Sequence, residues 1–230
     1  MSANGFMGFW SDIDADYRLQ YREWHNCEHM PERVGIPGFI EGRRYRAASD
    51  GHDFFMCYVT HGPEVLTGPD YLGALNRPTP WTKEALTHFR NPERSLYRRV
   101  GTIGAVPDHA PYIVLARFND ARSNADLLGL LDDAFGPASR DSKLSLYDMD
   151  TDGSKIMTAE RRIYSAGPGE RQYLIAAELT ERGAAEEAGR KLARLLDTAS
   201  DLHVALYWLE MRVRSADVRP YTQNNTEETP

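Results

Sequence analysis

The chain has 230 residues, of which 41% are hydrophobic and 10% aromatic, so it can form one large globular domain or two small ones with a real core. Its formal net charge of −7 argues against a broad nucleic-acid-binding face, which needs clustered Lys and Arg. The chain has neither the N-terminal pattern of a signal peptide nor a run approaching the ~18 apolar residues of a membrane span. Two cysteines are too few for a disulfide framework. We therefore expect a cytoplasmic protein without nucleic-acid or membrane partners.

The first half of the chain alternates strand and helix signals. Runs of aromatic and β-branched residues bounded by turn residues predict strands at residues 6–13, 39–47, 54–61 and 96–105. Helical spacing predicts helices at residues 14–30 and 81–89. Pro31 is expected to end the first helix, because its ring removes a backbone donor and crowds the preceding turn. The order β-α-β-β-α-β is that of a ferredoxin-like unit.

The second half repeats this order. Strands are predicted at residues 112–118, 161–165, 173–179 and 202–213, and helices at 124–135 and 181–199. Residues 143–149 are expected to form an extra strand or arm. Segments 43–60 and 161–180 also match weakly, since both begin with Arg-Arg, pass a small-residue turn with Gly and end in an apolar strand. A repeat of this length indicates a duplicated architecture.

The predicted fold follows from what each unit must bury. Helices cover one face of each predicted sheet, and the other face also needs cover. When two such sheets pack face to face, each covers the remaining face of the other. We therefore predict an α+β fold of two tandem ferredoxin-like (β-α-β-β-α-β) units, packed sheet to sheet as a dimeric-type α+β barrel within one chain. The predicted domains are residues 1–106, which carry the candidate site, and 110–215, followed by a flexible tail at 216–230.

The first predicted helix concentrates the groups that can move protons. A single helical stripe, with spacings of 4, 3 and 4, holds Tyr17, Tyr21, Trp24 and Glu28. Because three of its members are large aromatics, this stripe should face the sheet. Glu28 would then lose solvation against aromatic rings, which is typical of a general acid or base. His25 and His29, on the neighbouring row, could exchange a proton with Glu28 or with a ligand.

Structural roles for the same residues stay open. Glu28 could pair with Arg33, Arg43 or Arg44, and the histidines could cap the carbonyls at the helix end. The segment HNCEH also fits the H-x-x-E-H pattern of inverted zinc peptidases. A third ligand is not apparent in the sequence, so we expect no metal site. The chain also lacks the glycine-rich phosphate-binding motifs of nucleotide cofactors.

The segments WHNCEHMPER (24–33), PGF (37–39) and RRY (43–45) together resemble the first helix and second strand of EthD-like members of the dimeric α+β barrel superfamily. That superfamily includes antibiotic-biosynthesis monooxygenases, muconolactone isomerases, polyketide cyclases and haem-dependent chlorite dismutase-like enzymes. The specific match covers residues 21–45, and the second half lacks the His and Glu set. The resemblance implies a small-molecule pocket between the sheet and helices of the first half, and catalysis without an organic cofactor.

The leading hypothesis is thus a cofactor-independent enzyme that performs a dehydration, lyase reaction, isomerisation or cyclisation on a small apolar or aromatic molecule. His25 and Glu28 are the expected acid and base, with His29 assisting. The expected substrate-binding residues are Trp10, Tyr17, Tyr21, Trp24 and Arg44. Alternatives are a cofactor-free monooxygenase, a haem protein with His203 as axial ligand, and a non-catalytic ligand-binding domain. A small-molecule substrate is the expected partner, and the chain could form a homodimer.

Overall fold

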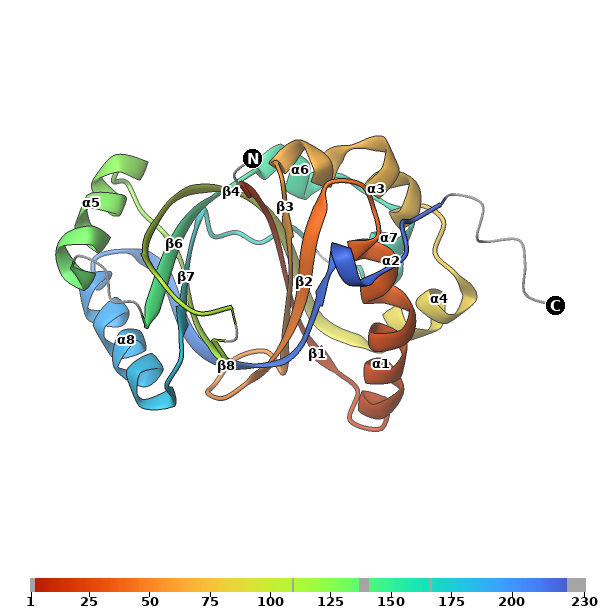
Figure 1. Ribbon diagram of the computed structural model, residues 1–230, viewed down its shortest axis with the longest axis horizontal. Helices are drawn as coiled ribbons and strands as arrows, with labels where there is room; N and C mark the ends of the chain where they lie inside the picture. Colours follow the sequence, from red (N-terminus) through yellow and green to blue (C-terminus); the bar gives the residue numbers. More distant parts are fainter. Residues whose placement is uncertain (1–2, 109, 137–140, 166, 223–230) are drawn as a thin grey trace.

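A computed structural model describes residues 3–108, 110–136, 141–165 and 167–222. Its strands form one closed antiparallel barrel in the order β1-β3-β2-β8-β5-β7-β6-β4 (Figure 1). The strands are β1 (Gly5–Ile13), β2 (Phe39–Ala47), β3 (Phe54–Thr60), β4 (Phe89–Ala105), β5 (Tyr112–Asn119), β6 (Ser142–Met149), β7 (Tyr173–Leu179) and β8 (Ser200–Arg214).

The barrel consists of two ferredoxin-like sheets, as predicted. Neighbouring strands run β4-β1-β3-β2 in the first unit and β8-β5-β7-β6 in the second, so both follow the same internal order. The long strands β4 and β8 join the units, because each pairs with its own unit at one end and with the other unit at its far end. This closure leaves the sheet without free edges, which removes a template for aggregation. The proposed division near residues 106–110 stays a prediction.

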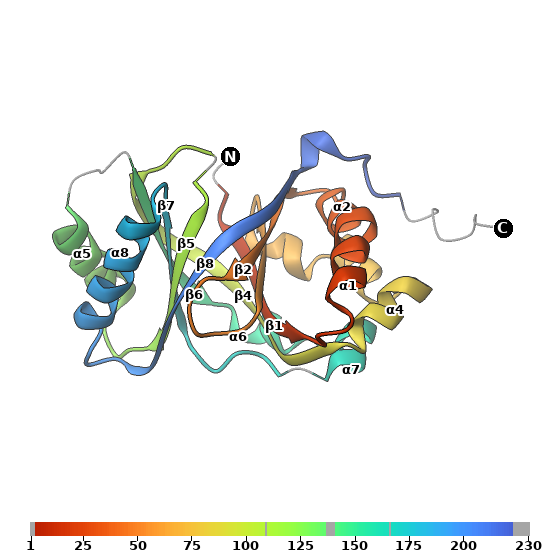
Figure 2. The ribbon, with the colours of Figure 1, turned by 90° about the horizontal axis from the view of Figure 1, so that it is seen from below.

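Helices lie on the two outer faces of the barrel. The first-half sheet is covered by α1 (Arg18–Trp24), η1 (His25–His29), α2 (Met30–Val34), η2 (Pro63–Thr67), α3 (Pro69–Leu75) and α4 (Pro80–Leu86). The second-half sheet is covered by α5 (Asn124–Phe135) and α8 (Arg182–Leu195) (Figure 2). Helix α5 has its predicted bounds and begins with a capping box, in which Ser123 and Asp126 satisfy each other's backbone N–H groups.

The core has three layers. One cluster fills the barrel interior, and one lies between each sheet and its helices. A strand inside such a layered structure is buried on both faces, and β7 is buried at every position. This explains why strands such as β5 and β7 are nearly continuous apolar runs in the sequence. None of the helices in the described ranges is long and apolar enough to cross a membrane.

The predicted strand at 161–165 is wrong, because residues 161–164 belong to helix α7 (Ala159–Tyr164) and Ser165 is its C-cap. The second unit's hairpin is instead formed by β6 and β7, so the segment expected to be an extra strand or arm is the true hairpin partner. The Thr158 hydroxyl accepts a hydrogen bond from the backbone N–H of Arg161 and so caps α7. In the weak match between segments 43–60 and 161–180, the Arg-Arg starts therefore lie on a strand and on a helix, whereas the apolar ends are β3 and β7, which hold the same position in the two units.

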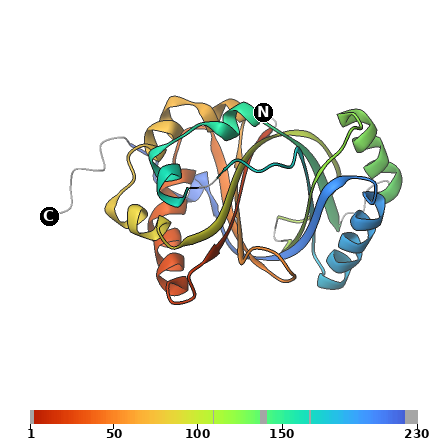
Figure 3. The same ribbon diagram turned by 180° about the vertical axis from the view of Figure 1, so that it is seen from behind.

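The connection between β6 and β7 crosses to the first half of the molecule. It carries α6 (Thr151–Lys155) and α7, which lie beside the first-half helices (Figure 3). At the C-terminal end, residues 216–222 of the predicted flexible tail lie against α2, where the Tyr221 N–H donates to the Gly35 carbonyl at 2.9 Å. The rest of that tail, residues 223–230, lies outside the described residues. Both segments add cover to the first-half helices.

Candidate functional site

The first long helix contains a wider turn, with one additional residue, at the segment HNCEH (25–29). Helices α1 and α2 are joined without a break by η1, a π-helical turn in which the Met30 N–H donates to the His25 carbonyl. Pro31 was expected to end the helix, but it lies in α2 directly after the π turn, and the helix continues to Val34. Such π turns occur mostly as single turns inside α-helices, frequently at functional sites. The extra residue also rotates the following side chains away from a regular 3.6-residue pattern.

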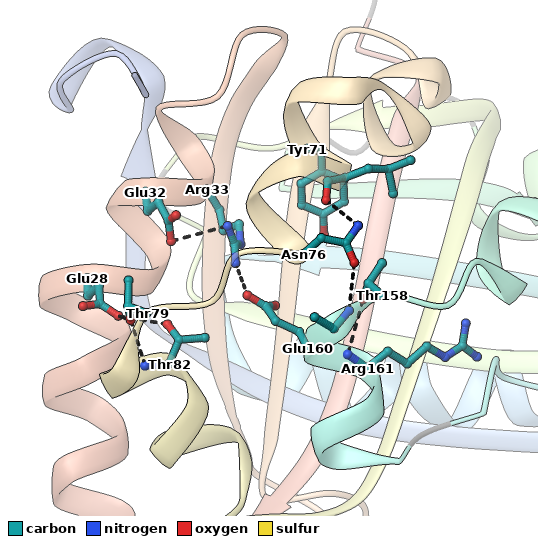
Figure 4. Close-up of polar contacts among 12 residues, drawn as sticks. Glu28, Glu32, Arg33, Tyr71, Asn76, Thr79, Thr82, Thr158, Glu160 and Arg161 are labelled. Carbon is teal, nitrogen blue, oxygen red and sulfur yellow. Dashed lines mark hydrogen bonds and ion pairs between the residues drawn. The ribbon is translucent and has the colours of Figure 1, made fainter. Parts of the chain in front are cut away.

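Glu28 is the residue that this rotation displaces from its expected place. Tyr21 and Trp24 are buried against the sheet, but Glu28 is only half-buried and points toward α4 (Figure 4). Its Oε1 accepts hydrogen bonds from the hydroxyls of Thr79 at 2.6 Å and Thr82 at 2.9 Å. The expectation that Glu28 lies among the aromatic rings is therefore wrong. In this structure Glu28 ties η1 to the first turn of α4.

Glu28→Ala is expected to lower the free energy of unfolding by about 1–2 kcal/mol, because it leaves two hydroxyls without their acceptor. Urea denaturation measures this change. The control is Glu23→Ala, an exposed position on α1 for which a change within about 0.5 kcal/mol is expected. Equal effects of the two substitutions would contradict the anchoring role of Glu28.

His25 is buried and fixed by Arg44. Arg44 Nη1 lies 3.3 Å from His25 Nδ1 and donates to Asn26 Oδ1 at 2.8 Å, while Arg44 Nε donates to Glu210 Oε2 at 3.0 Å. Since a guanidinium only donates, His25 Nδ1 must accept and its Nε2 must carry the proton. Burial, followed by the charge of Arg44, holds the pKa of His25 well below its ordinary value of 6.5. His25 is thus a neutral imidazole with a defined tautomer.

A small cavity of about 40 Å³ lies between the outer face of the first-half sheet and its helices. At roughly 10–15 Å³ per water, this volume holds a few waters, so a larger ligand must move lining side chains such as Met7 or Leu86. Most of the wall is apolar or aromatic. Its polar groups include those of His29, Arg33, Tyr58, Tyr71, Arg94 and Glu160.

His29 is the predicted catalytic residue that lines this cavity. Its ring lies against Trp24, with centroids 4.4 Å apart, and its buried Nδ1 has no hydrogen-bond partner among the described residues. Burial first, then the charges of Arg33 and His25, holds the pKa of His29 well below 6.5. A neutral imidazole with a free nitrogen beside a cavity can accept a proton from a bound molecule.

A buried ion pair joins the two halves of the chain and forms part of the cavity wall. Arg33 of α2 is 1% exposed and Glu160 of α7 is 3% exposed, and their side chains form an ion pair (Figure 4). Glu32 supports Arg33 from outside the cavity, with Oε2 at 3.4 Å from Arg33 Nη1. Burial raises the pKa of Glu160 to about 7, against the attraction of Arg33. Glu160 therefore titrates in the range useful for proton transfer.

The other residues expected to bind substrate occupy different places. Trp24 lines the cavity and donates from Nε1 to the Thr82 hydroxyl at 3.1 Å. Tyr21 lies behind it and donates to Met56 Sδ at 3.1 Å. Tyr17 stacks on His88, with centroids 3.7 Å apart. Trp10 belongs to the barrel interior, on the opposite face of the sheet, so of the five expected residues Trp24 alone lines this cavity.

Sequence reasoning did not single out Arg94, Glu160, Tyr58 or Tyr71. Arg94 could have been found by extending the predicted strand 96–105 back to Phe89, because Arg94 and Leu96 then share one face of β4. Glu160 had no such local signal. It reaches the cavity only because the connection between β6 and β7 crosses to the first half.

Among the residues that the structure describes, neither a metal-binding set nor a haem ligand is found. No group of three His, Cys, Asp or Glu in the described parts of the chain could hold a metal ion. His203 shares the strand face of Ala205 and Tyr207, which belong to the barrel-interior cluster. That interior is filled by aromatic side chains, so His203 does not face a space that fits a haem.

No protein-family model and no curated protein sequence matches the chain. Solved structures match over nearly its whole length. An anthrone oxidase-like protein is 11% identical with a TM-score of 0.58, covering 94% of each chain. Chlorite dismutase from Candidatus Nitrospira defluvii is 12% identical with a TM-score of 0.57, covering 92% of this chain and 93% of its own. A proposed monooxygenase from Lactobacillus acidophilus NCFM is 9% identical with a TM-score of 0.55, covering 93% and 97%. These similarities establish the dimeric α+β barrel fold.

Proposed function

We propose that the protein is a cofactor-independent enzyme that abstracts a proton from a small, largely apolar or aromatic molecule bound in the cavity beneath η1. The observation that carries this proposal is His29, a neutral imidazole whose Nδ1 lacks a partner in the described structure and whose side chain lines a mostly apolar cavity. Burial keeps this imidazole unprotonated at neutral pH, the state that a general base must have before it accepts a proton.

Each polar group has a distinct proposed role. His29 accepts the substrate proton, and Glu160, with a pKa of about 7, can return one. The buried Tyr58 hydroxyl has no partner among the described residues and can donate a hydrogen bond to the oxygen on which negative charge develops. His25 lies behind His29, with ring centroids 5.6 Å apart, and supports its position, while Glu28 holds α4.

A substrate that fills the cavity displaces its water, and contact with the apolar wall then strengthens these interactions. Isomerisation, dehydration, lyase reactions and cyclisation can all begin with such a proton abstraction. The chemistry agrees with the proposed EthD-like membership, because the segment 24–33 that carries the resemblance supplies Trp24, His29 and Arg33 to the cavity wall.

Deuterium exchange tests this proposal without knowledge of the final product. The protein is incubated in D₂O with a panel of small aromatic and carbonyl compounds, and NMR monitors the loss of C–H signals. At least one compound is expected to exchange, and His29→Gln should reduce its rate by about 10²–10⁴-fold, the usual contribution of a general base. The control is His61→Gln at an exposed histidine, which should keep the full rate. Full exchange by His29→Gln would overturn the assignment of the base.

A cofactor-free monooxygenase is the second candidate, and two of the similar structures carry oxidase or monooxygenase names. The same proton abstraction leaves a carbanion that can transfer electrons to O₂, so the substrate is oxidised while O₂ is reduced. An oxygen electrode separates the two candidates. Oxygen uptake that depends on the exchanging compound and on His29 would favour the monooxygenase, and turnover without uptake would favour the non-oxidative reactions.

A further inference from the structure

Arg94 is a buried cation that lines the cavity without a close anion. Its side chain is 5% exposed and projects from β4 toward α3. Its Nη2 donates to the Tyr71 hydroxyl at 3.4 Å, and its guanidinium carbon lies 5.8 Å from the Tyr71 ring centroid. No carboxylate in the described ranges lies within ion-pair distance of Arg94. A buried charge without a paired anion is unfavourable, so this arrangement suits an anion that arrives with a ligand.

The charged side chains around the cavity also favour an anionic ligand. Two of the charged side chains that line it are cations, Arg33 and Arg94, and one is an anion, Glu160. Glu160 is already committed to Arg33, and Glu32 reaches Arg33 from outside the cavity. The cavity wall therefore carries an excess of positive charge beside Arg94. The Tyr71 hydroxyl accepts from Arg94, so its own proton remains able to donate to a ligand oxygen.

We propose that Arg94 and the Tyr71 hydroxyl bind an anionic oxygen of the substrate, so that the enzyme acts on a small aromatic or unsaturated acid held by its carboxylate, phenolate or enolate oxygen. This substrate class rests on the proposed function, whereas binding of the anion does not require turnover. A guanidinium and a hydroxyl provide charge-assisted hydrogen bonds to such an oxygen, and the aromatic wall packs against the rest of the molecule.

Isothermal titration calorimetry with benzoate and its neutral isostere benzamide tests the proposal, at a pH where benzoate is fully ionised. Benzoate is expected to bind at least about tenfold more tightly than benzamide. Arg94→Met should abolish this preference, and Arg94→Lys should keep part of it, because lysine retains the charge but not the planar fork. The matched control is Arg98→Met, an exposed arginine on the same strand, which should leave the preference unchanged.

Equal binding of benzoate and benzamide, no binding of benzoate, or a preference that survives Arg94→Met would each overturn the proposal. If Arg94→Met fails to fold, Tyr71→Phe takes its place, and it should weaken benzoate several-fold while sparing benzamide. The outcome is separable from the proposed function. Selective benzoate binding without any deuterium exchange would support the anion site and contradict the proposed enzyme function. Exchange without a preference for benzoate would support the enzyme function and contradict the anion site.

Discussion

Glu160→Gln is expected to lower the free energy of unfolding by about 1–3 kcal/mol, because the amide no longer balances the buried charge of Arg33 but still offers it a hydrogen-bond acceptor. Arg33 is 1% exposed and cannot lose its proton, so it must remain charged when Glu160 is neutralised. Glu32 stays 3.4 Å from Arg33 Nη1 and offsets part of this cost, which places the expected value near the lower end of that range. Urea denaturation at neutral pH measures the difference.

The reciprocal change should cost less. In Arg33→Met, Glu160 can take up a proton and become neutral, because burial already raises its pKa to about 7. Replacing both residues by Met should bring stability back toward the wild type, since neither charge then remains buried. Glu186→Gln provides a control, because Glu186 forms an exposed ion pair with Arg182 that is worth at most about 1 kcal/mol. Glu160→Gln with no larger effect than this control would show that the pair does not hold the two halves together.

The stability of the protein is expected to fall steeply as the pH drops below about 6.5. Burial lowers the pKa of both His25 and His29, so the folded state does not bind protons that the unfolded chain takes up near pH 6.5. Their contribution is complete above this pH and is lost below it, at up to about 1.4 kcal/mol per pH unit for each histidine. The two together give a slope of up to about 2.7 kcal/mol per pH unit.

Glu160 acts in the opposite sense. Its pKa is raised from 4.5 to about 7, so its contribution is complete below pH 4.5 and is lost as the pH rises through 7. The net slope between these values is therefore smaller than that of the histidines alone. Urea denaturation across this pH range should show a slope about 1.4 kcal/mol per pH unit lower in His29→Gln than in the wild type. Equal slopes would mean that His29 is protonated as readily in the folded state as in the unfolded chain.

The amino-acid sequence by itself determined the architecture of this protein. The pairing of strand and helix signals predicted two ferredoxin-like units in one barrel, and the predicted helix at 124–135 matches the bounds of α5. The aromatic stripe also predicted that Tyr21 and Trp24 pack against the sheet. These features depend on periodicity, caps and turns, which are encoded by residues close together in the chain.

Only the tertiary structure decided how the site is assembled. The π turn displaces Glu28 from the aromatic stripe, and a helical pattern with a 3.6-residue period cannot anticipate the added residue. Helix α7 replaces a predicted strand and brings Glu160 to Arg33 across 127 positions of sequence. Arg94 joins them from β4. No local pattern records such contacts, because a charge becomes buried and paired only when distant segments pack together.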